Sequence, residues 1–136
     1  YFGIPVVVSF TVETDGRLPS GETLAGAIQE VDLQTSWYAS HYMINCAHPY
    51  HFRDVLKEGG YWKSRIKGIR ANASCKSHAE LDALESLDAG DKEQLARDYR
   101  ELAELLPNLR VIGGCCGTDH GHMEQICSLF FRALAT

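Results

Sequence analysis

Residues 4–31 read IPVVVSFTVETDGRLPSGETLAGAIQEV, which divides into a strand, a turn and a helix. Residues 4–12 are apolar and β-branched, as expected of a parallel strand buried on both faces. Residues 13–16, Glu-Thr-Asp-Gly, are a turn signal, and Ser20 is placed to cap a helix. Four apolar residues then follow helical spacing: Leu24, Ala27, Ile28 and Val31. The stretch predicts one strand-then-helix unit.

The strand-then-helix pattern occurs three more times along the chain. Strands are predicted at residues 42–46, 66–71 and 109–112. The helix signals between and after them are a brief helical run at Val55 and Leu56, a capping box at Ser77, a helix start at Asp91, and a last helix capped by Thr118 or Asp119. Because strands and helices alternate, the sequence predicts an α/β fold with a parallel sheet.

Composition excludes several classes of protein. The chain has 136 residues and a formal net charge of −5, from 13 Lys and Arg against 18 Asp and Glu. This is enough chain for one globular domain or part of a larger one. No apolar run approaches the roughly 18 to 20 residues that span a bilayer, so we expect no membrane protein. The scattered, outnumbered basic residues argue against a nucleic-acid partner.

The cysteines are the most informative residue type. They number five, contain no C-x-x-C pair, and are Cys46, Cys75, Cys115, Cys116 and Cys127. An odd number fits poorly with the disulfide framework of a secreted domain, which favours a reducing, cytoplasmic location. Cys46 ends the second predicted strand, and Cys115 and Cys116 follow the fourth. Since function gathers at the carboxyl ends of parallel strands, three thiolates meeting there suit zinc with its fourth position open for catalysis.

Glycines surround the adjacent cysteines, in the segment GGCCGT at residues 113–118. Successive residues of a regular strand point to opposite faces, so Cys115 and Cys116 reach one ion only if the backbone leaves strand geometry. We expect Gly113, Gly114 and Gly117 to supply that freedom.

The segment GGCCGT, followed by Asp119 and His122 and joined with Asn45-Cys46, resembles the homocysteine S-methyltransferase family. The segments PVVVSFTVETDGRLPSG, MINCAHP, GIRANAS and SHAELD look like the branch that uses S-methylmethionine or S-adenosylmethionine. The resemblance implies zinc held by Cys46, Cys115 and Cys116. It also implies transfer of a methyl group to the thiol of homocysteine, giving methionine, with no catalytic protein side chain.

The family forms an eight-stranded (β/α) TIM barrel, and residues 1–136 look like its last four β/α units, as a single segment. We therefore expect a piece of a longer enzyme, inactive alone, whose partner is the N-terminal half of the barrel. The alternative is that two copies pair to close a barrel, because half a barrel leaves edge strands unpaired.

Other polar residues have weaker signals. Glu13, after the first strand, is a candidate for binding the substrate ammonium, although the turn chemistry alone also explains it. Asn45, before the first zinc cysteine, is a second candidate, either for binding the substrate or for orienting a metal ligand. Asn72 is a weaker candidate for the pocket. The remaining residues are expected to be structural: a hydrogen bond for His48, solvent or loop capping for His120 and His122, an incidental Cys75, and a core position for Cys127.

Two other functions are compatible with the same residues. The glycine-rich loop before the last helix could bind a phosphate through its backbone N–H groups, although it lacks the Lys of a P-loop. Alternatively, the adjacent thiols could form a redox switch or a closed structural metal site, without catalysis.

Overall fold

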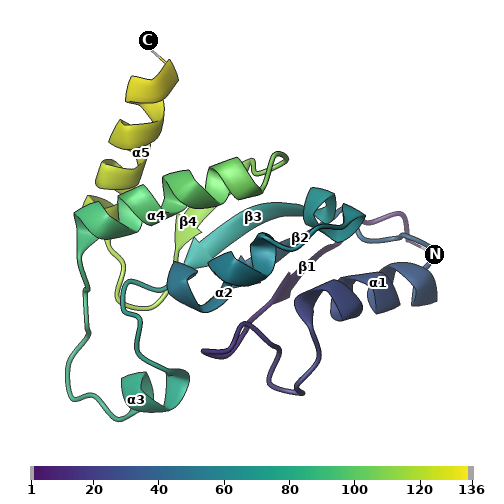
Figure 1. The fold of residues 1–136 in the computed structure, drawn as a ribbon, viewed down its shortest axis with the longest axis horizontal. Coiled ribbons are helices and arrows are strands. Elements are labelled where there is room, and N and C mark those ends of the chain that lie inside the picture. The colour runs from purple at the N-terminus through teal and green to yellow at the C-terminus, as the bar shows by residue number, and fades with distance from the viewer. Residues whose placement is uncertain (1, 135–136) are drawn as a thin grey trace.

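The computed structural model describes residues 2–134 and contains one parallel four-stranded sheet in the order β1-β2-β3-β4. The strands are β1 (Val7–Phe10), β2 (His41–Asn45), β3 (Ile66–Ala71) and β4 (Val111–Gly114). The helices between and after them are α1 (Leu24–Gln34), α2 (Pro49–Leu56), the 3-10 helix η1 (Tyr61–Arg65), α3 (His78–Asp82), α4 (Lys92–Leu105) and α5 (His120–Leu134). The predicted α/β fold with a parallel sheet is confirmed (Figure 1). Within residues 2–134, no helix has the length and apolar character needed to cross a membrane.

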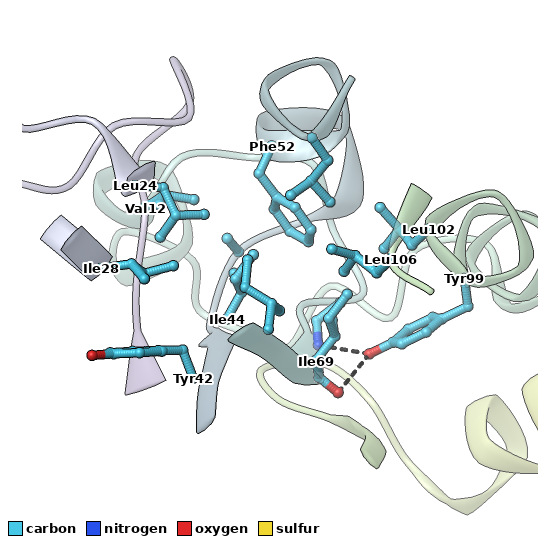
Figure 2. Close-up of a cluster of buried hydrophobic side chains, with 14 of the residues drawn as sticks. Val12, Leu24, Ile28, Tyr42, Ile44, Phe52, Ile69, Tyr99, Leu102 and Leu106 are labelled. Atoms are coloured by element: carbon cyan, nitrogen blue, oxygen red, sulfur yellow. Dashed lines mark hydrogen bonds between the residues drawn. The ribbon is translucent and has the colours of Figure 1, made fainter. Parts of the chain in front are cut away.

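The hydrophobic core lies between one face of the sheet and the helices α1, α2 and α4 (Figure 2). Its fully buried side chains include Tyr42, Ile44 and Ile69 from the strands, and Leu24, Ile28, Phe52 and Leu102 from the helices. On the opposite face, Val7 and Ser9 of β1 and Arg70 of β3 are exposed. The prediction that the first strand is buried on both faces is therefore wrong, because helices pack on one face only.

Three strands have bounds that differ from the sequence prediction. β2 spans His41–Asn45 where the prediction gave 42–46, so Cys46 follows the strand and does not end it. β1 is four residues long, shorter than the predicted 4–12. β4 begins at Val111 and includes both glycines before the cysteines, whereas the prediction placed the strand at 109–112. The fourth strand therefore runs directly into Cys115.

The helix caps explain where most of the helices begin. The capping box of Ser77 and Glu80 is confirmed at α3, and the Asp91 side chain caps α4. The cap of α1 is Thr23, whose hydroxyl accepts from Gly26 N at 3.1 Å, so the predicted Ser20 cap is wrong. Ser20 instead donates to the Glu22 carboxylate.

α2 begins much earlier than the brief helix predicted around Val55 and Leu56. The imidazole Nδ1 of His48 accepts from Tyr50 N at 3.2 Å and caps the helix. Pro49 follows at the first helical position, where its fixed φ suits a helix and its missing N–H is not needed. The segment after Cys46 thus turns directly into a helix.

Tyr99 connects α4 to the ends of two strands. Its buried hydroxyl donates to Gly113 O at 2.6 Å and accepts from Ala71 N at 2.8 Å. Figure 2 shows the ring reaching from its helix to the strand that carries Ile69. Burial raises the pKa of Tyr99 to about 12, so the phenol stays protonated and donates. The contact holds β3 and β4 together just before the cysteine loop.

Candidate metal centre

Cys46 is the first residue after β2, and its backbone leaves strand geometry there. Its φ is +54°, in the left-handed region that residues with a side chain seldom adopt. The Cys46 N–H donates to Arg70 O at 3.0 Å, and its carbonyl accepts from the Thr11 hydroxyl at 3.4 Å. The surrounding contacts therefore hold Cys46 in a strained conformation, as is common at functional sites.

Cys115 and Cys116 follow β4, and the end of β3 binds both of them. The Cys115 N–H donates to Ala71 O at 2.9 Å, and the Ala73 N–H donates to Cys116 O at 3.0 Å. The Cys116 N–H donates to the side-chain Oδ1 of Asn72 at 3.1 Å. Because β3 lies between β2 and β4, its end joins the Cys46 turn to the Cys115–Cys116 loop.

The sulfur atoms of these three cysteines lie within 4.8 Å of one another. Cys46 and Cys115 are paired as a disulfide, with their Cα atoms 5.5 Å apart, while Cys116 is free and exposed. A disulfide requires only two of these residues, so it does not explain why the sulfur of Cys116 lies beside the other two. Three thiols from two strand ends fit a soft, thiolate-binding metal ion such as zinc.

The glycines of the loop have different roles. Gly117 has a φ of +77°, so the predicted conformational freedom is confirmed there. Gly113 and Gly114 are ordinary strand residues, and for them the prediction is wrong. Each instead leaves space for a neighbour: a Cβ on Gly113 would lie 3.2 Å from Arg70 Cγ, and one on Gly114 would collide with the Thr118 hydroxyl.

Asn72 bonds to the cysteine loop, a role not predicted from the sequence. It is 2% exposed, and its side chain bonds to the backbone of Cys116, as described above. This contact fixes the position of a cysteine. The sequence signal was present, since an Asn directly after a parallel strand lies next to the residues that follow the neighbouring strands.

The two predicted substrate-binding residues lie after different strands. Asn45 is the last residue of β2, and its Oδ1 accepts from the Ser9 hydroxyl at 2.5 Å. Glu13 is half-buried in the turn after β1, where its N–H donates to Arg17 O and its carbonyl accepts from Gly16 N. Asn45 therefore adjoins Cys46, and Glu13 belongs to the neighbouring turn.

Three histidines were predicted to be structural: His48, His120 and His122. Two of them, His48 and His122, are buried. His48 is the cap of α2, as its predicted structural role requires, and burial together with His51 and Arg53 lowers its pKa to about 4. His122 is fully buried, so the solvent-facing alternative is wrong for it. The loop-capping alternative is confirmed, because the imidazole Nδ1 of His122 accepts from Asp119 N at 3.0 Å. The Nε2 of His122 lies 2.7 Å from Ala89 O and its Nδ1 lies 2.9 Å from Asp119 Oδ1. His120 is exposed, as predicted.

Asp119 marks the start of α5. Its Oδ1 accepts from Gly121 N at 2.9 Å and from His122 N at 3.2 Å, which is the bonding of an N-cap. Hydrogen bonds from Lys92 and His122 hold the pKa of its carboxyl well below the usual range. Of the two caps predicted for this helix, Asp119 is confirmed.

Cys75 and Cys127 are both free and exposed. The core position predicted for Cys127 is wrong. α5 instead buries Ile126 and half-buries Met123, which leaves the thiol of Cys127 exposed to solvent. Neither cysteine belongs to the sulfur cluster.

A cavity of about 320 Å³ opens beside Cys116 and Gly117. Its other wall is formed by α3 and the loop after it, including the apolar Leu81 and the carboxylates of Asp82 and Glu85. Asp88 also lines it, but its carboxylate is bound by Lys76 and Ser74, and the bond from Lys76 lowers its pKa to about 2. Figure 1 shows α3 beyond the carboxyl ends of the strands. The cluster therefore adjoins a mostly apolar cavity that acidic residues also line.

Comparison with known proteins gives one match. The family model described as homocysteine S-methyltransferase matches residues 2–130, which is almost the whole chain. No curated protein and no solved structure matches the chain. Four parallel strands with interleaved helices are compatible with part of a barrel of that family.

Proposed function

Because the chain belongs to the homocysteine S-methyltransferase family, we propose that it forms the zinc-binding part of an enzyme that methylates homocysteine to methionine. The observation that carries the proposal is the third sulfur: Cys116 lies within 4.8 Å of both Cys46 and Cys115. Three thiolates would hold the metal and leave one position for the substrate.

The chain's own residues bind and position, and none is assigned as an acid or base. Zinc bound by Cys46, Cys115 and Cys116 would lower the pKa of a thiol at its open position, so that the thiol reacts as the thiolate at neutral pH. The substrate sulfur forms a bond to the methyl carbon while the bond from that carbon to the donor breaks. With a sulfonium donor, the leaving group is a neutral thioether.

The methyl donor is proposed to be S-methylmethionine or S-adenosylmethionine. Both carry a positively charged sulfonium sulfur. The cavity beside Cys116 offers the carboxylates of Asp82 and Glu85 together with apolar surface from Leu81, which suits a cation with an aliphatic chain. Its position next to Cys116 would bring the methyl group close to the acceptor sulfur.

Glu13 and Asn45 are proposed to bind the acceptor. Asn45 directly precedes Cys46, and its side chain lies on the sheet face away from the helices. Glu13 carries a carboxylate at the end of the neighbouring strand, where it would attract the substrate ammonium. The two side chains therefore complement the two charged groups of an amino acid.

The active unit is proposed to be a closed barrel completed by further strands, from an N-terminal half or from a second copy. β1 and β4 are the edges of the sheet, each with one strand neighbour within residues 2–134. Val7 and Val111 on these edges are 44% and 43% exposed. We expect the chain alone to be inactive, and a cytoplasmic, reducing location would keep its thiols available to the metal.

The contacts of the cysteine loop support the two alternative functions less well than they support the proposed one. A phosphate-binding loop needs free backbone N–H groups, but those of Cys115, Cys116 and Thr118 already donate within the protein. A redox function is favoured by the pairing of Cys46 with Cys115, and it leaves the position of Cys116 unexplained. The zinc content of the reduced protein distinguishes the redox function from the proposed one.

The activity is tested by incubating the complete enzyme with zinc, homocysteine and one donor at a time. S-methylmethionine, S-adenosylmethionine and betaine should be compared side by side, with methionine as the measured product. We expect methionine from a sulfonium donor. If none of the three donors yields methionine, homocysteine is not the acceptor.

A further inference from the structure

Arg70 lies on the open face of the sheet, in the strand that joins the two cysteine loops. Its register partners are Asn45 of β2 and Gly113 of β4. Its carbonyl accepts the hydrogen bond from the N–H of Cys46, and its neighbour Ala71 accepts the one from Cys115. Arg70 therefore occupies the row of residues directly beneath the sulfur cluster.

The Arg70 side chain extends across β4 toward the cysteine loop. Its Nε donates to Gly114 O at 3.3 Å, and the missing Cβ of Gly113 leaves space for its aliphatic part. Among residues 2–134, no carboxylate forms an ion pair with Arg70 and no acceptor binds its terminal nitrogens. Within the part of the chain that the structure describes, the two terminal nitrogens of this oriented guanidinium therefore have no acceptor.

Asn45 adds further donors to the same row. Because the Ser9 hydroxyl donates to Asn45 Oδ1, the acceptor atom of the amide is already used. The amide nitrogen of Asn45 has no acceptor among the residues that the structure describes. The surface beneath Cys46 therefore presents N–H donors from two adjacent strands, and no carboxylate among residues 2–134 bonds to them.

We infer that Arg70, with the amide nitrogen of Asn45, binds the carboxylate of the amino-acid acceptor. This inference rests on the function proposed above and specifies how the site selects its thiol. A guanidinium binds a carboxylate through two parallel hydrogen bonds, which fixes its orientation as well as its position. The short aliphatic chain of homocysteine would then let its sulfur reach the cysteines while its carboxylate stays on Arg70.

The test compares two acceptors in the complete, zinc-loaded enzyme and in its Arg70→Met variant. The acceptors are homocysteine and 3-aminopropane-1-thiol, which is homocysteine without its carboxylate. We expect kcat/KM for homocysteine to fall about 10- to 100-fold in Arg70→Met, chiefly through KM, because a charge-assisted contact is lost. The activity toward 3-aminopropane-1-thiol should stay unchanged, and Arg70→Lys should recover part of the preference.

Lys67 provides the matched control, since it is a cation on the same strand and lies at its opposite end. Lys67→Met should keep the wild-type preference for homocysteine. Zinc content and unfolding curves measured on every variant separate a lost contact from a lost fold. If Arg70→Met prefers homocysteine as strongly as the wild type does, the inference is overturned while the proposed function stands. If the wild type methylates neither thiol, both are overturned.

Discussion

The side-chain oxygen of Asn72 accepts a hydrogen bond from the backbone N–H of Cys116 at 3.1 Å. Asn72 is buried at the end of β3, and its own N–H donates to Ala47 O, next to Cys46. One residue therefore contacts both cysteine segments without offering a ligand itself. Residues of this kind orient metal ligands and influence metal affinity.

Replacing Asn72 with Ala should weaken metal binding. The Cys116 N–H would lose its acceptor, so we expect zinc affinity to fall about 10- to 100-fold and the free energy of unfolding to fall by about 1–3 kcal/mol. Competition with a chelator measures the affinity. Asn108→Ala is the control, since that amide bonds to Ser64 O and to neither cysteine loop. Equal zinc affinity in the two variants would contradict this role for Asn72.

Neutralising the carboxylates of Asp82 and Glu85 in the cavity beside Cys116 should affect the donor and not the acceptor. In the double variant Asp82→Asn, Glu85→Gln, we expect KM for a sulfonium donor to rise about 2- to 10-fold, as for exposed charges. The effect should shrink at high salt because salt screens these charges. KM for homocysteine should stay the same, and Glu104→Gln on α4 should change neither. A donor KM equal to that of the wild type would show that the donor binds elsewhere.

Removing the hydroxyl of Tyr99 should loosen the ends of β3 and β4. In Tyr99→Phe, the N–H of Ala71 and the carbonyl of Gly113 both lose a buried partner, so unfolding should become easier by about 1–3 kcal/mol. Urea denaturation measures the change. Tyr61→Phe is the matched control, because Tyr61 is 46% exposed. A Tyr99→Phe variant as stable as the wild type would rule out this contribution.

His48 should make stability depend on pH below neutrality. Burial lowers its pKa to about 4 from the ordinary 6.5, so between these values the unfolded chain binds a proton that the folded one does not. The free energy of unfolding that depends on His48 is thus fully present above pH 6.5. It decreases as the pH drops toward 4, by roughly 3 kcal/mol in total. His48→Asn keeps a helix cap without the titration. The unfolding curves of His48→Asn should lack this part of the pH dependence. If the variant shows the same pH dependence as the wild type, His48 is not its cause.

Much of the fold could be predicted because its signals are local. The spacing of apolar residues and the capping side chains of Ser77 and Asp91 depend on neighbours in the sequence, and they predicted the order of strands and helices. The placement of Cys46 with Cys115 and Cys116 followed from a general rule, that parallel strands end at the same edge of a sheet.

Contacts between distant segments could not be predicted in this way. Asp32 is a fully buried carboxylate on α1, and nothing near it in the sequence explains why it is tolerated there. Its partners are Arg65, at 2.9 Å, and the hydroxyl of Tyr42, at 2.8 Å. The burial of His122 depends likewise on the Ala89 carbonyl, 33 residues away in sequence. Such pairs follow from packing, which single-residue patterns do not describe.

The most direct test of the zinc site is the zinc content of the reduced, complete enzyme and of its Cys116→Ala variant. Cys116 distinguishes a metal site from the Cys46–Cys115 pair, which does not need it. We predict about one zinc ion per chain in the wild type and in the Cys75→Ala control, and loss of that zinc in Cys116→Ala. Full zinc content in Cys116→Ala, or a reduced wild-type enzyme that binds none, would contradict the account.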